Sequence, residues 1–209
     1  MCSSDLPDAP KTVGLIGLGA GALAAYAKPG DHWVFYEISP SVVRAAKQDF
    51  TFLEKMKGTY EIVIGDGRLS LDREPSRKFD VLAIDAFSGD SIPTHLITKE
   101  AMEIYMKHLK PDGVIVFQAT NRFVDLLPVA RNLADAHGLS IVVVADSPDY
   151  ETGPEYWYAH TDQVIMTRNT KLLNQEKVKS GAEEIPKRAG YPMFTDDYIN
   201  LLRLFKRGS

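Results

Sequence analysis

Seven short, nearly continuous apolar runs are the feature of this sequence that most constrains its fold. They are rich in Val and Ile, and segments of helical character separate most of them. A strand that is apolar along its whole length is typical of a parallel sheet whose two faces are both covered by helices. The runs span residues 12–18, 32–38, 60–66, 79–87, 113–120, 139–146 and 162–168.

The segments between these runs carry helix signals. Ser39 is expected to cap a helix that begins at Pro40, Thr98 to cap the next helix, and Gly138 to end a third. The alternation predicts an α/β, Rossmann-like, doubly wound sheet of seven strands. No crossover helix is apparent between the last two runs, so the last strand is expected to be antiparallel. The expected helices cover residues 20–27, 40–50, 99–109 and 123–137.

The chain has 209 residues, a length that suits one domain. We expect a flexible leader over 1–11, a nucleoside-binding domain over 12–168, and a C-terminal extension over 169–209 that ends in a short amphipathic helix. The net charge of −4 offers no electrostatic footprint for nucleic acid, and it is compatible with a cationic small substrate.

The lone cysteine, Cys2, cannot form an internal disulfide, which favours a reducing compartment. The first ten residues lack the basic and apolar regions of a signal peptide. The longest apolar stretch, residues 13–27, is rich in glycine and too short to span a bilayer. These features predict a cytoplasmic protein without a membrane partner. The spacing of the five histidines suggests no metal site.

A glycine-rich turn follows the first run, with Gly17, Gly19 and Gly21 at alternate positions. Such a turn lets the backbone approach a ligand closely, and Glu37 at the end of the second run can accept both hydroxyls of a ribose. The pattern Gly17-x-Gly19-x-x-Ala22 also satisfies a dinucleotide fingerprint. The pattern Gly17-x-Gly19-x-Gly21 suits S-adenosylmethionine. A tight turn that binds nothing is the third interpretation.

Acidic residues also lie near the ends of the third and fourth runs. Asp66 can accept a hydrogen bond from the adenine amine, and Gly67 can leave room for the ring, although Asp-Gly is also a common turn. Asp85 lies at the tip of the fourth run, and Asp90 lies five residues later. This grouping suits a cationic sulfonium better than a dinucleotide. Alternatively, Asp85 bonds a neighbouring loop and Asp90 belongs to a turn.

Several longer segments resemble those of the spermidine synthase-like proteins. They are "GLGAGAL", "YEIS", "GDGRL", "FDVLAIDAFSGDSIPTHLITKEA", "YMKHLKPDGVIVFQATNRFVDL" and "FTDDY", and the resemblance extends over about residues 12–205. It implies the class I S-adenosylmethionine-dependent methyltransferase-like fold with an antiparallel last strand. It also implies aminopropyl transfer from decarboxylated S-adenosylmethionine to an amine such as putrescine.

The resemblance further implies roles for individual residues. Asp85 would anchor the amine near the sulfonium, and Asp90 would be the base or a second anchor. An attacking amine must be neutral, so a carboxylate that organises its deprotonation is needed nearby. The implied donor-binding residues are Gly17, Gly19, Gly21, Glu37, Ile38, Asp66, Gly67, Asp85 and Ala86.

The chain departs from the family pattern at three places. Ala20 stands where the family has an Asp that grips the donor's amine, and "DAFSGDSIP" is longer than the family's Asp-Ser-Ser-Asp-Pro. The resemblance also implies an N-terminal hairpin domain that covers the site and forms the dimer, whereas this sequence starts almost directly at the first run; a homodimer is a common state for soluble enzymes. These departures keep two alternatives open: an S-adenosylmethionine-dependent methyltransferase and a non-catalytic nucleoside-binding module.

Three further features have two interpretations each. Aromatic and acidic residues alternate within 147–161, where they could receive a polyamine cation or pack the loop onto the sheet. Asp196 and Asp197 could likewise receive a polyamine cation, or they could lie at the N-terminus of the last helix. His95 lies near the expected site and could act as an acid or base, but a lone histidine is more often structural.

Overall fold

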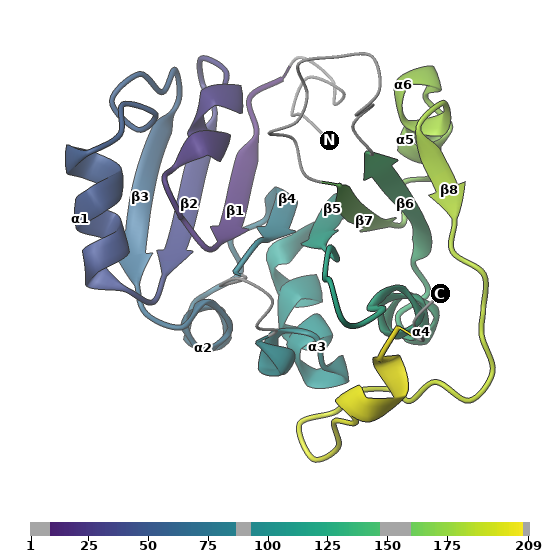
Figure 1. Ribbon diagram of the computed structural model, residues 1–209. Helices are drawn as coiled ribbons and strands as arrows, with labels where there is room; N and C mark the ends of the chain where they lie inside the picture. Colours follow the sequence, from purple (N-terminus) through teal and green to yellow (C-terminus); the bar gives the residue numbers. More distant parts are fainter. Residues whose placement is uncertain (1–8, 87–92, 147–159, 207–209) are drawn as a thin grey trace, which may run out of the picture.

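The computed structural model describes residues 9–86, 93–146 and 160–206, which form one eight-stranded sheet with helices on both faces (Figure 1). The strand order is β3-β2-β1-β4-β5-β7-β6-β8. Strands β1 to β5 pair in parallel, whereas β7 runs antiparallel to both β5 and β6. The strands are β1 (Thr12–Ile16), β2 (His32–Glu37), β3 (Thr59–Ile64), β4 (Phe79–Ile84), β5 (Leu109–Gln118), β6 (Ser140–Asp146), β7 (Thr161–Thr167) and β8 (Ala182–Glu184).

This topology confirms the doubly wound fold and the antiparallel last strand of the seven predicted runs. The predicted number of strands is wrong, because β8 pairs antiparallel with the outer side of β6. β8 has only three residues, Ala-Glu-Glu, and two of them are exposed. A short, charged strand is a common way to end a sheet, and it leaves no apolar run in the sequence.

Side chains of the strands alternate between two apolar clusters. Val34, Ile84 and Ile115 are fully or almost fully buried in the cluster covered by α2 (Gly67–Arg73), α3 (Lys99–His108) and α4 (Leu127–Ala136). On the other face, the 3-10 helix η2 (Ala22–Tyr26) and α1 (Pro40–Gln48) cover β1 and β2. Helices α5 (Thr170–Leu173) and α6 (Glu176–Lys179) cover the β5–β7–β6 end of that second face. Burial on both faces explains the unbroken apolar runs.

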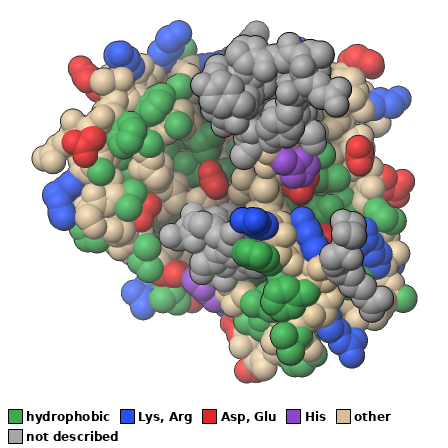
Figure 2. All heavy atoms as spheres, in the orientation of Figure 1, with side chains coloured by type: hydrophobic (Ala, Val, Ile, Leu, Met, Phe, Trp, Pro, Cys, Tyr) green, Lys and Arg blue, Asp and Glu red, His purple; other side chains and the backbone are tan. Residues whose placement is uncertain are grey.

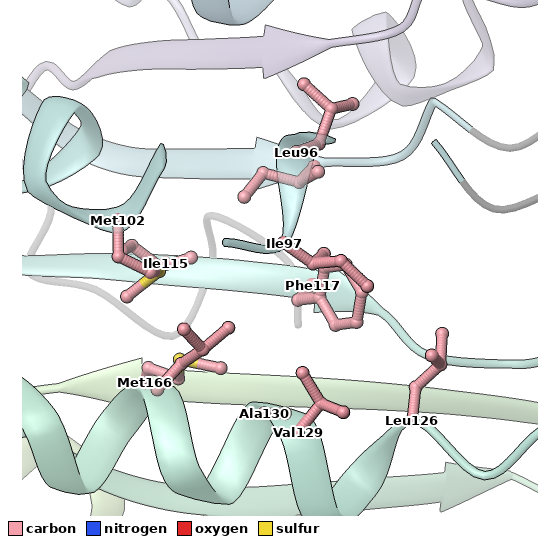
Figure 3. A pocket seen from close by; sticks show the side chains of 11 residues that line it. Leu96, Ile97, Met102, Ile115, Phe117, Leu126, Val129, Ala130 and Met166 are labelled. Carbon is pink, nitrogen blue, oxygen red and sulfur yellow. The ribbon is translucent and has the colours of Figure 1, made fainter. Parts of the chain in front are cut away.

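Packing between the sheet and helices α3 and α4 is close. Figure 3 shows the apolar side chains there pointing toward one another from β5, β7 and α4. They leave a void of about 10 Å³, and its lining is almost wholly apolar. A space that holds at most a single water and offers it no hydrogen-bond partners stays dry. This void is part of the core and not a ligand site.

Most predicted helix ends are confirmed, with two corrections. The Thr98 hydroxyl accepts a hydrogen bond from the Ala101 N–H, and Gly138 adopts a left-handed φ of 63° after α4. Helix α1 begins at Pro40, but the side chain of Ser39 does not cap it, because its Oγ lies 2.9 Å from Ser41 Oγ. The helix expected over 20–27 is a five-residue 3-10 helix.

The predicted C-terminal helix is shorter than the amphipathic segment that suggested it. Among the described residues at this end of the chain, Leu201–Leu204 is helical, as a 3-10 turn, and Thr195 and Tyr198 close a tight turn before it. The segment pairs back onto residues 121–126, and this contact delays α4 to Leu127 instead of residue 123. Figure 2 shows hydrophobic side chains gathered over this C-terminal segment beside Lys and Arg side chains, and Leu202 is 80% exposed.

Two of the sequence predictions concern residues that the structure does not describe. Asp90 lies within 87–92, and most of the aromatic and acidic loop lies within 147–159. Among the described residues, no helix has the length and apolar character that crossing a membrane requires.

Candidate active site

A cleft of about 500 Å³ opens where β1 to β4 end. Ligands of open α/β sheets bind outside the carboxyl ends of the strands, so the position suits a binding site. Among its described lining residues are three carboxylates, and the other titratable groups among them are His95 and the buried Tyr36. The described lining contains no Lys or Arg. Its residues are Ile16, Gly17, Gly19, Tyr36, Glu37, Ile38, Ser39, Val42, Gly65, Asp66, Gly67, Asp85, Ala86, Pro93, His95 and Leu96.

The three glycines of the first turn occupy different environments. A Cβ on Gly17 would lie 2.2 Å from the carbonyl oxygen of Asp85, so only glycine lets β1 and β4 converge here. Gly19 has a φ of 53°, and a Cβ there would meet no atom within 4 Å, so it borders open space. Gly21 does not line the cleft, because a Cβ on it would face Leu53 in the apolar cluster. The cleft therefore contains two of the three predicted glycines.

Glu37 is held rigidly at the end of β2. Its Oε2 accepts a hydrogen bond from the Leu18 N–H (3.0 Å), and its Oε1 accepts one from the Ser39 N–H (2.8 Å). The residue is 7% exposed. A carboxylate can accept about four hydrogen bonds, so about two acceptor positions remain for a ligand. Ile38, directly after it, is 68% exposed and offers an apolar surface at the rim of the cleft.

Asp66 has two partners within the protein. Its Oδ1 caps α2 by accepting a hydrogen bond from the Leu69 N–H (2.9 Å), and its Oδ2 lies 2.8 Å from His95 Nε2. Gly67 makes room for protein and not only for a ligand, because a Cβ there would lie 2.7 Å from Ile16 Cγ2. The predicted Asp-Gly turn is the start of a helix, and His95 belongs to the cleft.

Asp85 lies at the end of β4, and its N–H donates to the carbonyl of Ile16. The side chain is accessible to solvent, but the protein atoms around it displace part of its hydration and raise the pKa of its carboxyl. Ala86 follows it in the cleft. A carboxylate with a raised pKa is better suited to accept a proton than an ordinary one.

Sequence reasoning missed the residues that support this end of the cleft. The Arg68 guanidinium binds the carboxylate of Asp196, and the hydroxyl of Thr98 donates to the same carboxylate at 2.8 Å. No local signal in the sequence indicated Arg68, because the Asp-Gly pair before it predicts a turn and not the helix whose first turn it occupies. Of the two interpretations of Asp196, the start of a helix is wrong, because the last helical turn begins at Leu201 and Asp196 pairs with Arg68. Contact with a polyamine stays a prediction.

The strand order and the position of the cleft define a protein with the class I methyltransferase-like fold. A model of the spermine/spermidine synthase domain matches residues 9–145 of the chain. The chain therefore belongs to the spermine/spermidine synthase family.

Individual relatives agree with this membership. A polyamine aminopropyltransferase of Vibrio vulnificus (strain CMCP6) is 33% identical over 183 residues, which are 84% of this chain and 56% of the relative. This chain thus spans about half of that relative's length.

Two solved structures share the fold at low sequence identity. A probable spermidine synthase from Corynebacterium glutamicum is 18% identical, with a TM-score of 0.67 over 92% of this chain and 74% of that one. A spermidine synthase in complex with the transition-state analogue AdoDATO is 20% identical, with a TM-score of 0.55 over 86% of this chain and 63% of that one.

Proposed function

We propose that the cleft binds the adenosine part of a cationic sulfonium donor, and that the chain transfers an aminopropyl group from decarboxylated S-adenosylmethionine to a small amine. The observation that carries this proposal is the charge of the cleft, which has three carboxylates and no Lys or Arg among its described lining residues. Such a lining attracts a sulfonium and an amine, and it repels the pyrophosphate of a dinucleotide. The named activity of the Vibrio relative supports the same reaction.

The geometry suggests how each side chain would hold the donor. Glu37 has the free acceptor positions that two ribose hydroxyls need, and its own position is fixed by two backbone N–H groups. Ile38 would pack against the adenine, and Asp66 would accept a hydrogen bond from the adenine amine. Gly19 borders open space where the ribose and the sulfonium would pass.

Asp85 would act on the amine. In the reaction, the amine nitrogen attacks the aminopropyl carbon bonded to sulfur, the C–S bond breaks, and its electron pair neutralises the sulfonium. Methylthioadenosine leaves. The amine must lose one proton in the course of the reaction, and Asp85 would accept that proton or pass it to solvent. Because the donor is already activated by its charge, the remaining task is alignment of the nitrogen with the carbon. Asp90, outside the described residues, stays a prediction as a second base or anchor.

Ala20 favours a second candidate function. It replaces the acidic residue that the family resemblance implies at this turn, and it is only half-buried next to Gly19. Without that acid, the site has less reason to prefer a donor with a free amine over S-adenosylmethionine itself. A methyltransferase acting on a small molecule is therefore the alternative, and a nucleoside-binding module without turnover is the third outcome of the test.

Calorimetric titration with methylthioadenosine, decarboxylated S-adenosylmethionine and S-adenosylmethionine tests the proposal. Mass spectrometry then follows products with a panel of amines. We expect preference for the decarboxylated donor and a product that gains an aminopropyl group only when an amine is present. Methyl transfer would favour the alternative, and tight binding without any product would favour the binding module. Light scattering on the same sample tests the predicted homodimer.

A further inference from the structure

Arg68 occupies a position that is unusual for a basic residue. It is the second residue of α2, whose N-terminus carries the positive end of the helix dipole, and its side chain is only 12% exposed. Both ends of its guanidinium fork bind the carboxylate of Asp196, with Nη1 to Oδ1 at 2.7 Å and Nη2 to Oδ2. A bidentate pair of this kind fixes both position and orientation.

Asp196 is itself anchored on the start of α3. Its Oδ1 accepts a further hydrogen bond from the fully buried Thr98 hydroxyl at 2.8 Å, and its N–H donates to Glu100 Oε2 at 2.9 Å. The Lys99 N–H donates to the carbonyl of Phe194, a buried residue of the same segment, at 2.8 Å. The pKa of the Asp196 carboxyl is lowered, chiefly by its hydrogen bond with Arg68. Residues 194–196 thus form a fixed support behind Arg68.

The same guanidinium reaches the lining of the cleft. Arg68 Nη1 donates to the backbone carbonyl of His95 at 2.7 Å. The ring Nε2 of His95 lies 2.8 Å from Asp66 Oδ2, while Asp66 Oδ1 caps α2. His95 and Asp66 both line the cleft. A continuous series of polar contacts therefore joins the C-terminal segment to the carboxylate at the adenine end of the cleft.

We propose that Arg68 is a positioning residue for the nucleoside cleft, and that Asp196 holds it in place. Arg68 fixes the backbone of His95, and His95 orients the Asp66 carboxylate toward the ligand. This inference rests on the proposed function in one respect, since it requires that the cleft binds an adenosine. It adds that the segment around Asp196, far from the glycine turn in the sequence, is part of the binding site.

The chemistry of the contact explains why the residue is an arginine. One guanidinium serves acceptors in different directions, the carboxylate of Asp196 and the carbonyl of His95, with Thr98 Oγ1 as a longer third contact at 3.3 Å. A lysine ammonium is a compact charge on a flexible stem and lacks this planar fork. Lysine at position 68 would keep the charge but would not hold both acceptors in a fixed relation.

Two conservative variants, Asp196→Asn and Arg68→Lys, test the inference by calorimetric titration with methylthioadenosine. Each should weaken binding roughly tenfold, because small misplacements of positioning groups have large effects. The matched controls are Asp197→Asn, which removes an adjacent exposed acid, and Arg73→Lys, which changes an exposed arginine at the other end of α2. Both controls should bind within twofold of the wild type.

Two further readouts distinguish positioning from general stabilisation. In steady-state kinetics, the variants should raise the KM for the donor more than they lower kcat, and circular dichroism should show a folded protein at the assay temperature. The double variant Arg68→Lys/Asp196→Asn should bind no more weakly than about the worse single variant, because the two residues act as one unit.

The outcomes separate this inference from the proposed function. Wild-type protein that binds no adenosine-containing ligand would contradict the proposed function and, with it, the inference. Wild-type binding together with unchanged affinity in both folded single variants would overturn only the inference. Losses in the two controls equal to those in the test variants would overturn it as well, because the effect would then not depend on the positions of Arg68 and Asp196.

Discussion

Glu37 offers the sharpest test of how the cleft holds its ligand. Its carboxylate accepts hydrogen bonds from the N–H groups of Leu18 and Ser39, at 3.0 and 2.8 Å, and keeps about two acceptor positions for ribose hydroxyls. In Glu37→Gln, one oxygen becomes an NH₂ group. That group cannot accept from a backbone N–H or from a hydroxyl, so one internal hydrogen bond and one charge-assisted hydrogen bond to the ligand are lost.

The expected magnitudes follow from these two losses. Losing a ligand hydrogen bond to a charged group costs about 1.5–3 kcal/mol, which weakens methylthioadenosine binding roughly 10- to 100-fold. The unpaired backbone N–H should lower the free energy of unfolding by about 1–3 kcal/mol in urea titrations. Glu54→Gln, at an exposed acid after α1, is the matched control. Calorimetry that finds equal affinity in Glu37→Gln and the wild type would refute the ribose assignment.

Three further predictions concern the strand ends. Asp85→Asn should lower kcat by about 10²–10⁴-fold and leave methylthioadenosine affinity within about threefold, and wild-type turnover would exclude Asp85 from the reaction. The melting temperature should stay equal or rise, because the variant removes a carboxyl whose folded-state pKa is raised by desolvation. Because the pKa of the Asp85 carboxyl is raised, kcat/KM should fall on the acidic side at a pH above the ordinary aspartate pKa of about 3.9, where Asp85 becomes protonated. An acidic limb at or below a pH of about 3.9 would contradict the role of Asp85 as the proton acceptor. Gly17→Ala should destabilise the fold by about 3 kcal/mol or more in urea titrations, because its Cβ would meet the Asp85 carbonyl. Gly19→Ala should cost only about 1 kcal/mol of stability and weaken nucleoside binding, and equal stability of the two variants would argue against this account of the turn.

The doubly wound fold and strands β1 to β7 could be predicted because most of these strands are buried on both faces and are therefore nearly continuous apolar runs. Leu15 and Ile16, for example, enter opposite apolar clusters from adjacent positions of β1, so both must be apolar. Strand β8 has no apolar run that would predict it from the sequence. Its two glutamates need only the backbone of β6 as a partner.

Helix α2 was not predicted, because two glycines stand at its start. Gly65 and Gly67 around Asp66 indicate a turn, yet Asp66 caps a seven-residue helix whose Leu71 is fully buried. The opposite error occurs at Asp196, where acids followed by apolar residues indicate a helix start. The tertiary partner Arg68, 128 residues away, takes the Asp196 carboxylate instead. Contacts between such distant positions leave no local pattern.

The candidate site was predictable to the extent that it is built from strand ends. Glu37 ends β2, Asp66 and Asp85 follow β3 and β4, and parallel strands bring their carboxyl ends to one edge. The support behind them was not predictable. His95 enters the cleft through a short 3-10 turn, Thr94–Leu96, whose position depends on its contact with Arg68. Gly67 lines the cleft as expected, but the sequence did not indicate that a Cβ there would also lie 2.7 Å from Ile16 Cγ2.

The most direct test of the central claim is a crystal structure of the chain soaked with methylthioadenosine, with a nicotinamide dinucleotide soaked into a parallel crystal. We expect the nucleoside in the cleft, with its ribose hydroxyls within hydrogen-bond distance of Glu37 and its adenine amine beside Asp66, and we expect the cleft to exclude the dinucleotide. Density for the dinucleotide in that cleft, or for the nucleoside at another place, would contradict the claim.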